Sequence, residues 1–217
     1  MNIKKIISYS LVGSMLSYMV FLGNEGLIAN ADTATSTSTS TLPIAVTLNV
    51  TTEIDLSCPN SVALSAISGL TGGTSSNTAD CNVKTNSSGG YTLLVHASTT
   101  PALKSGSNFF SDYRTASPEY TFTNPSTASS SFGFSASSTD ASAFKSSSGT
   151  CGSGSTDYTH CFRSFVGTGD VTVSTSVAPT AASGTTTTLN FEAQVGNTAM
   201  QAYGNYTANV TVTAVAQ

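Results

Sequence analysis

Three stretches in the last third of the chain alternate between apolar and polar residues: 170–177, 185–195 and 205–216. In the second stretch, for example, Leu189 and Phe191 alternate with Asn190 and Glu192. Successive side chains of an extended chain point to opposite faces, so a period of two residues gives each stretch one apolar and one polar face. The pattern predicts three half-buried strands of an antiparallel sheet.

A similar alternation begins much earlier in the chain. Within residues 45–56, polar residues separate five apolar ones: Val46, Leu48, Val50, Ile54 and Leu56. This pattern predicts a strand over the whole stretch. Residues 81–85 and 91–96 flank a segment with two glycines, 86–90, and together they predict a strand, a turn and a second strand.

The middle of the chain has weaker patterns. Residues 69–76 contain three glycines and are expected to form a loop. Between residues 98 and 168, only 119–122 and 132–134 are predicted as short strands, because they are rich in aromatic residues. A short helix is predicted at 140–145.

These elements predict an all-β fold. No segment after residue 31 has the 3.6-residue periodicity of a convincing amphipathic helix. We expect an antiparallel β-sandwich, immunoglobulin-like or jelly-roll-like, with a closed barrel as the alternative. No internal repeat divides the sequence, so residues 45–217 are expected to form a single domain.

The first 31 residues have the features of a signal peptide. Lys4 and Lys5 precede an apolar run over residues 6–22, and Ala29 and Ala31 form an A-x-A pattern. Small residues at these two positions are typical of a signal-peptidase site, so we expect cleavage after Ala31. The alternative is an uncut membrane anchor, although a run of about 17 residues is at the lower limit for crossing a bilayer.

Residues 32–44 are expected to be a linker. Nine of them, residues 33–41, are all Ser or Thr apart from one alanine, and such a tract has nothing to bury in a core. The predicted organisation is therefore a signal peptide at 1–31, a Ser/Thr-rich linker at 32–44 and a β domain at 45–217. No second apolar run of membrane length follows, so no membrane span is expected once the signal is removed.

The charge of the chain disfavours some partners. It has 7 basic and 11 acidic residues, a net charge of −4, and only 8 % charged residues against about 25 % in ordinary globular proteins. Nucleic acids and anionic membranes attract clustered Lys and Arg, which this sequence lacks. Because 39 % of the residues are hydrophobic and many alternate, the composition is nevertheless that of a folded protein.

Four cysteines stand in the predicted exported part: Cys58, Cys81, Cys151 and Cys161. An even number of cysteines in an exported protein predicts disulfides and an extracellular or cell-surface location. Of the three possible connectivities we favour Cys58–Cys81 with Cys151–Cys161, because cysteines close in sequence pair first. Zinc binding is the competing interpretation, but the sequence has no C-x-x-C motif, and only His160 lies beside a cysteine.

Few residues are candidates for catalysis. The sequence has no P-loop, H-E-x-x-H, G-x-S-x-G or EF-hand motif. His96 and His160 are the only histidines, and a triad would need one of them beside a serine and a carboxylate. The acidic residues stand singly, without a calcium-binding cluster or a clear pair for glycoside hydrolysis. We therefore expect no catalytic residues, no cofactor and no bound metal.

The final stretch carries a resemblance to a group of known proteins. Gly204-Asn205-Tyr206-Thr207-Ala208-Asn209-Val210-Thr211-Val212-Thr213-Ala214 resembles the last strand of many bacterial surface β-sandwiches. Taken with residues 185–195 and the early cysteine-containing strands, it is similar to exported surface proteins of small-genome bacteria. It is more distantly similar to WxL-type wall-binding domains and to pilus-like coat subunits. WxL domains are named after a tryptophan motif, and this chain has no tryptophan.

Three functions are compatible with the sequence. The first is a non-catalytic structural or adhesive protein of the cell surface, with cell-envelope glycans or other surface proteins as partners. The second is a carbohydrate-binding module that uses Tyr113, Tyr120 and Tyr158, and the third is a secreted hydrolase. Self-assembly into a surface fibre or layer is a variant of the first, because residues 45–56 could pair with a neighbouring copy. Pairing within the same chain is the favoured interpretation, since consecutive strands usually lie side by side.

Overall fold

The computed structural model describes residues 43–217 except 115, 125, 166 and 168. The chain divides into two compact units, residues 1–48 and residues 49–217, and every strand of the described residues belongs to the second unit. The predicted signal peptide, with its cleavage residues Ala29 and Ala31, and the predicted linker up to residue 42 lie outside the described residues.

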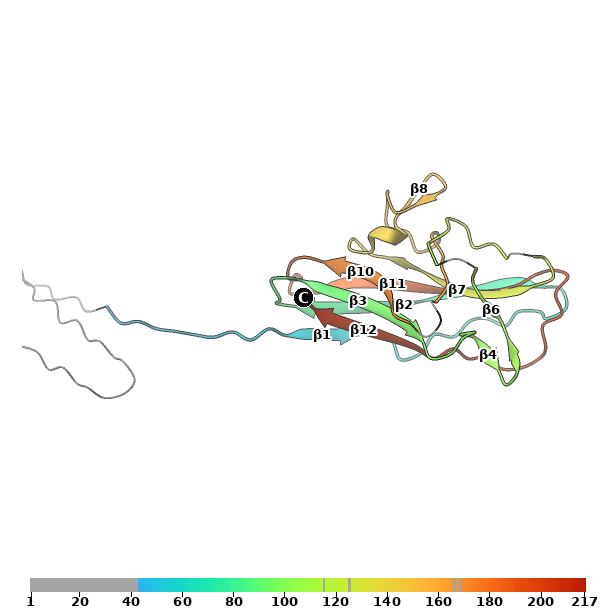
Figure 1. Ribbon diagram of the computed structural model, residues 1–217, viewed down its shortest axis with the longest axis horizontal. Coiled ribbons are helices and arrows are strands. Elements are labelled where there is room, and N and C mark those ends of the chain that lie inside the picture. The colour runs from blue at the N-terminus through green and yellow to red at the C-terminus, as the bar shows by residue number, and fades with distance from the viewer. Residues whose placement is uncertain (1–42, 115, 125, 166, 168) are drawn as a thin grey trace, which may run out of the picture. The chain divides into compact units, whose positions relative to one another are not determined.

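Two larger sheets make up most of the second unit (Figure 1). The five-stranded sheet has the order β1 (Ile54–Ser57), β2 (Gly73–Thr85), β11 (Thr185–Val195), β7 (Ser130–Ser137) and β6 (Ser111–Asp112). The three-stranded sheet has the order β10 (Val171–Ser176), β3 (Tyr91–Ala97) and β12 (Val210–Ala216). Two small hairpins complete the strands: β4 (Lys104–Ser105) with β5 (Asn108–Phe109), and β8 (Ser146–Ser147) with β9 (Thr150–Cys151).

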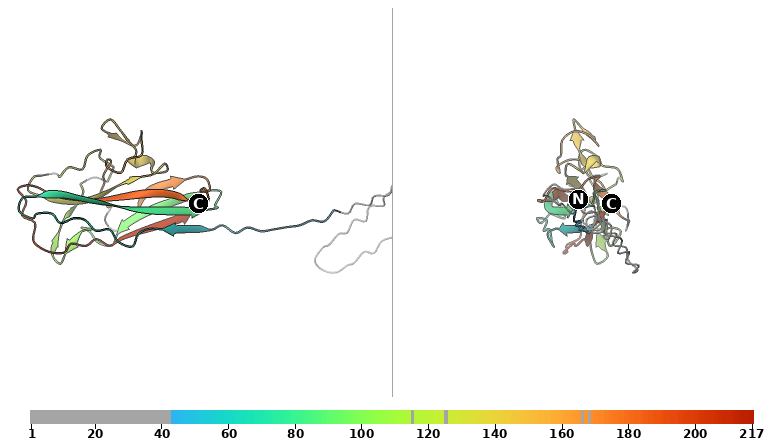
Figure 2. Two further views of the ribbon diagram at one scale, coloured as in Figure 1. Left: turned by 180° about the vertical axis from the view of Figure 1, so that it is seen from behind. Right: turned by 90° about the vertical axis from the view of Figure 1, so that its left-hand side faces the viewer.

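The prediction of an all-β protein is confirmed. The described residues contain no α-helix, only the single 3-10 turn η1 (Ser142–Phe144), which replaces the helix predicted at 140–145. Every strand pair is antiparallel except β6 with β7, which is parallel. The long strands β2 and β11 pair over eleven residues and lie side by side when the molecule is viewed from behind (Figure 2, left).

One apolar core is shared by the two larger sheets. Val95 of β3, Val171 of β10, Leu189 of β11 and Phe134 of β7 are all at most 2 % exposed and belong to the same cluster. The alternation seen in the sequence explains this arrangement, because most apolar residues of each strand point toward the other sheet. Ser174 and Thr187 are exceptions, because both are buried and their hydroxyl oxygens lie 3.3 Å apart. Burying the apolar side chains supplies the main favourable free energy of folding.

The strongly alternating stretches were predicted well. The strand predicted at 185–195 is β11, and the strand predicted at 170–177 is β10 with one residue fewer at each end. The last strand, β12, begins only at Val210, but Val210 and Val212 face the core and Thr211 faces water, as the pattern indicates.

Two predictions in the less patterned regions are wrong. The loop predicted at 69–76 is too long, because β2 begins at Gly73 and its polar first half pairs with β11. The strand predicted at 119–122 does not form, and only Glu119 makes an isolated bridge, to Phe162. In both places pairing with a distant segment decides the structure, and local composition carries no sign of that partner.

The strand predicted at 45–56 forms only at its end. Residues 43–53 have no regular secondary structure, and β1 takes up Ile54–Ser57 alone. Ile44, Val46, Leu48 and Val50 are 73–87 % exposed, whereas Ile54 and Leu56 pack against buried apolar residues.

The structure contains the disulfides Cys58–Cys81 and Cys151–Cys161, the connectivity favoured from the sequence. The first joins the residue that follows β1 to the middle of β2, and the second joins β9 to a loop. The loops they close span 23 and 10 residues, for which the chain-entropy relation gives a stabilisation of about 3 kcal/mol each.

The burial of β10 predicts contrasting effects for two neighbouring substitutions. Val171→Asp should lower the free energy of unfolding by about 3 kcal/mol or more, because it places an unpaired carboxylate in the core. Thr172→Asp, on the exposed face, should lower it by less than about 1 kcal/mol. Urea unfolding followed by circular dichroism measures both, and equal losses would contradict the assigned faces.

Candidate functional site

A cavity of about 1060 Å³ lies beside the shared core. Its floor is the inner face of the five-stranded sheet, where β2, β11 and β7 contribute Ala79, Leu189, Phe191 and Phe132. Residues of β12 and of the loop before it form one wall, and the chain that follows β1 forms the other. The alternation of β11 places its apolar side chains here, so a single strand face serves both the core and the cavity.

The second wall is an irregular segment, residues 58–70, which we call the strap. The strap is fixed at one end by the Cys58–Cys81 disulfide and at the other by a hydrogen bond from the Gln201 N–H to the Gly69 carbonyl (3.0 Å). Between these points, the Asn77 side chain donates to the Ala63 carbonyl (2.9 Å). No backbone ladder joins strap residues 59–67 to a sheet in the part of the chain that the structure describes. The strap therefore covers the cavity without continuing either sheet.

The first wall is formed by residues 201–212. The Gln201 amide donates to the Tyr206 hydroxyl (2.7 Å), which in turn donates to the Ala202 carbonyl (2.7 Å). The Tyr206 ring also contacts Phe110 edge to face, with ring centroids 5.0 Å apart. These contacts hold the loop before β12 in place although most of it has no strand partner.

The chemistry of the cavity is that of an apolar binding site. None of the residues that line it is charged, and most are aliphatic or aromatic. Such a site can bury an uncharged apolar occupant, and its lining among the described residues has no carboxylate, imidazole or amine. The cavity was not predictable from the sequence, because Val62, Leu64 and Ile67 of the strap do not alternate strictly and the remaining walls come from distant segments.

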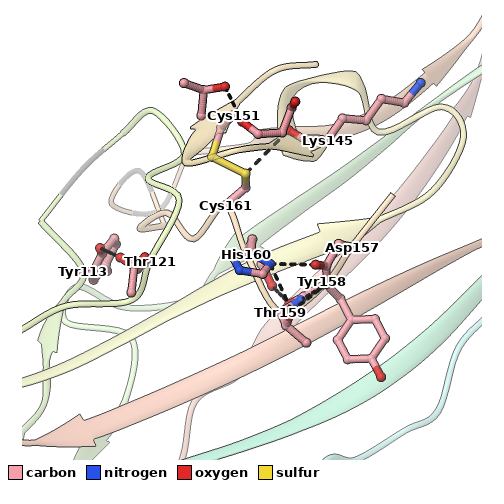
Figure 3. Close-up of a disulfide and its surroundings, with 12 residues drawn as sticks. Tyr113, Thr121, Lys145, Cys151, Asp157, Tyr158, Thr159, His160 and Cys161 are labelled. Atoms are coloured by element: carbon pink, nitrogen blue, oxygen red, sulfur yellow. Dashed lines mark hydrogen bonds and ion pairs between the residues drawn. A yellow bond between two sulfur atoms is a disulfide. The ribbon is translucent and has the colours of Figure 1, made fainter. Parts of the chain in front are cut away.

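The ionisable cluster nearest to a catalytic arrangement surrounds His160, beside the Cys151–Cys161 disulfide (Figure 3). His160 Nδ1 lies 2.6 Å from Asp157 Oδ2, and the N–H and hydroxyl of Thr159 both donate to Asp157 Oδ1 (2.8 and 2.7 Å). The Tyr120 ring lies against the imidazole with centroids 4.1 Å apart. Burial acts to raise the pKa of Asp157, but the hydrogen bonds from Thr159 and His160 outweigh it and lower that pKa below its ordinary value.

This cluster has the base and the orienting carboxylate of a triad, but its hydroxyl group, Thr159 Oγ1, lies 3.1 Å from the same Nδ1 that faces Asp157 and donates to that carboxylate. Among the described hydrogen bonds of His160, only Nδ1 takes part, and no serine or cysteine is hydrogen-bonded to the ring. The Asp157–Thr159–His160 contacts are all local, within four residues of chain, and hold the loop that precedes Cys161. We interpret the cluster as a loop-stabilising element.

The other candidate histidine lies elsewhere on the fold. His96 is on the side of β3 opposite the buried residues, and its Nδ1 lies 3.0 Å from Asp170 Oδ1. Both partners of this pair are substantially exposed, so the pair contributes little to stability. No hydrogen bond joins it to the His160 cluster within the described residues.

Glu192 of β11 has a strongly raised pKa. Burial on the outer face of the sheet raises the pKa of Glu192 from 4.5 to about 7. Asn190, two residues earlier on the same face, donates its amide to the Tyr158 carbonyl (3.0 Å). No second carboxylate is hydrogen-bonded to Glu192 in the described part of the chain, so the pairing that glycoside hydrolysis uses is not shown.

No three His, Cys, Asp or Glu side chains come together as a metal site among the described residues. Within the same residues, no helix is long and apolar enough to cross a bilayer.

Comparisons with known proteins add no relative. No protein-family model, no curated protein and no solved structure matches this chain.

The position of Glu192 predicts a pH-dependent gain from Glu192→Gln. A carboxyl whose pKa is raised in the folded state stabilises below its unfolded pKa and loses that contribution as pH rises toward about 7. The variant should match the wild type at pH 4 and be more stable at pH 8 by about 1 kcal/mol, after allowance for the partial exposure of this side chain.

Urea unfolding at the two pH values measures this difference. Thr186→Ala serves as the control, because it lies on the same face of β11 and has no titratable group. The control should change stability equally at both pH values, and the same pH-independent behaviour in Glu192→Gln would contradict the prediction.

Proposed function

We propose that this protein is a non-catalytic structural or adhesive protein of the cell surface, exported and built as an antiparallel β-sandwich. The observation that carries the proposal is the large uncharged apolar cavity beside the shared core. Its chemistry suits the docking of another apolar chain, whereas the described ionisable groups include no carboxylate pair and no serine or cysteine hydrogen-bonded to a histidine.

Export is supported by the cysteines and the sequence before the β domain. Two disulfides are typical of proteins that fold in an oxidising compartment and are rare in the cytosol. The A-x-A pattern at Ala29 and Ala31 also indicates export, from the sequence alone. The sandwich is supported by the single core that the two larger sheets share.

A carbohydrate-binding module is the second candidate. Of the three tyrosines expected to contact a sugar, the structure leaves one substantially exposed and free of a ring partner among the described residues. Tyr113 is buried and stacks on Phe122, so it cannot meet a sugar. Tyr120 lies against His160, while Tyr158 is 43 % exposed and could still form an apolar platform. Of the three tyrosines, Tyr158 alone has the exposure that contact with a cell-envelope glycan requires.

The proposal predicts where the protein is found and what it does not do. Antibody labelling of intact cells should place it on the surface or in the medium, and the purified protein should cleave no substrate in a broad hydrolase panel. Substrate turnover that disappears in His160→Ala would overturn the proposal in favour of a hydrolase.

A glycan array separates the two binding functions. Wild type and Tyr158→Ala should give the same background signal if the protein is structural. Specific glycan binding that Tyr158→Ala abolishes would instead establish the carbohydrate-binding module.

A further inference from the structure

We infer that residues 44–50 of one copy enter the cavity of a second copy as an extended strand, so that copies join head to tail. This inference deepens the proposed function and rests on it, because strand exchange would make a surface protein the subunit of a fibre. Four features of the structure support it: the exposed segment, the chemistry of the cavity, its unpaired walls, and the path of the chain before β1.

The segment has an exposed apolar side. Ile44, Val46, Leu48 and Val50 are each at least 73 % exposed. Because they stand at every second position, they lie on one side of an extended chain. A row of four large exposed aliphatic side chains is typical of a surface that meets another chain.

The cavity matches this row in chemistry and in length. Neither residues 44–50 nor the residues that line the cavity include a charge. A seven-residue strand spans about 20–23 Å, and the part of β2 alongside the strap, from Gly73 to Cys81, spans about 26 Å at the same rise per residue. The cavity can therefore accept the whole segment along its floor.

The walls of the cavity offer backbone groups for a new strand. Strap residues 59–67 take part in no backbone ladder in the described structure, and β1 pairs with β2 only from Asn82 to Thr85. Unpaired strand edges bind extended chains through main-chain hydrogen bonds, while alternate side chains fill pockets below. A strand between the strap and β12 would satisfy both requirements.

The path of the chain before β1 favours a second copy over the same copy. The Asn86 side chain accepts from the Glu53 N–H (2.7 Å) and donates to the Thr51 carbonyl (2.8 Å). The Thr85 hydroxyl donates to the Glu53 carbonyl (2.7 Å). These bonds extend the line of β1 backward to Thr51, in the direction opposite to the strap.

A reversal of the chain would also reach too little of the cavity. A two-residue hairpin loop at 52–53 would place Leu48 opposite Ser57 and Ile44 opposite Ser61. Leu48 and Val50 would then lie beside β1, which already lies against β12. The cavity continues to Leu70, so a segment from the same chain would leave most of it empty.

The resulting interface between copies is heterologous, because the segment of one copy contacts the cavity of another. Such contacts leave a free segment at one end and a free cavity at the other, so they generate open chains of copies unless the rotation between neighbours closes a ring.

Labelled peptide binding tests the inference directly. The acceptor is the exported chain, residues 32–217, carrying Val46→Asp and Leu48→Asp, so that its own segment cannot compete. Both positions are highly exposed, so this acceptor should fold like the wild type, which circular dichroism checks. The probe is a fluorescent peptide of residues 43–52, followed by anisotropy.

The expected result is saturable binding of the wild-type peptide. The same peptide with Val46→Asp and Leu48→Asp should bind about 100-fold more weakly or worse, because two buried aliphatic side chains are replaced by charges. A matched peptide carries Thr47→Asp and Asn49→Asp on the other side of the strand. It should bind about tenfold more tightly, or better, than the Val46→Asp, Leu48→Asp peptide. No saturable binding, or equal weakening by both pairs of substitutions, would overturn the inference.

Sedimentation of the wild-type chain shows whether the segment that fills a cavity comes from the same copy or from a neighbouring one. Head-to-tail exchange predicts multimers that grow with concentration and are shortened when the Val46→Asp, Leu48→Asp chain is mixed in, because that chain accepts a segment but donates none. The wild type could instead stay monomeric and fail to bind the peptide, although the Val46→Asp, Leu48→Asp acceptor binds it. Such a result would show that each segment occupies the cavity of its own chain. That result would overturn the inference.

These outcomes are independent of the test of the proposed function. A protein with hydrolase or glycan-binding activity whose copies still exchange strands would refute the proposed function alone. A surface protein without either activity whose cavity binds no peptide would refute strand exchange alone.

Discussion

The larger sheet depends on the pairing of β11 with a strand on each of its edges. All eleven of its residues pair with β2, and eight of them pair with β7. The inner face of β11 carries Leu189, Ala193 and Val195, which are buried in the shared core and also line the cavity. A change that shifts the register of β11 by one residue would move this set to the opposite face. The core and the cavity would then be lost together.

The cavity can be understood as a place where one sheet of the core is left incomplete. Where β1 lies beside β12, the two sheets close on each other, and Val83, Tyr91 and Leu93 form a small buried cluster there. Beyond Cys58 the strap replaces β1, and no ladder continues toward β12 within the described residues. The Cys58–Cys81 disulfide stands at this transition, so it holds the strap close to β2 where hydrogen bonds no longer do. Strand exchange, as proposed, would restore the missing strand.

The sequence predicted the fold where one period dominates a whole strand. β11 matches its predicted range, and β10 and the buried face of β12 follow from alternation, because their apolar sets can be buried only on one side. The polar first half of β2 was missed, since Ser, Thr and Asn at its start carry no alternation and its pairing with β11 bridges about a hundred residues. Residues 45–53 show the opposite error. They have the pattern of a strand, but a pattern shows only that a strand could be buried and not where its partner lies.

Hydrogen–deuterium exchange of the full chain, measured at low and at high protein concentration, tests the central claim most directly. If copies complete one another's core, the amides of residues 44–50 and of strap residues 59–67 should exchange fast in dilute protein and become protected together as the concentration rises. Protection of residues 44–50 that is the same at every concentration, or none even in concentrated protein, would contradict the account.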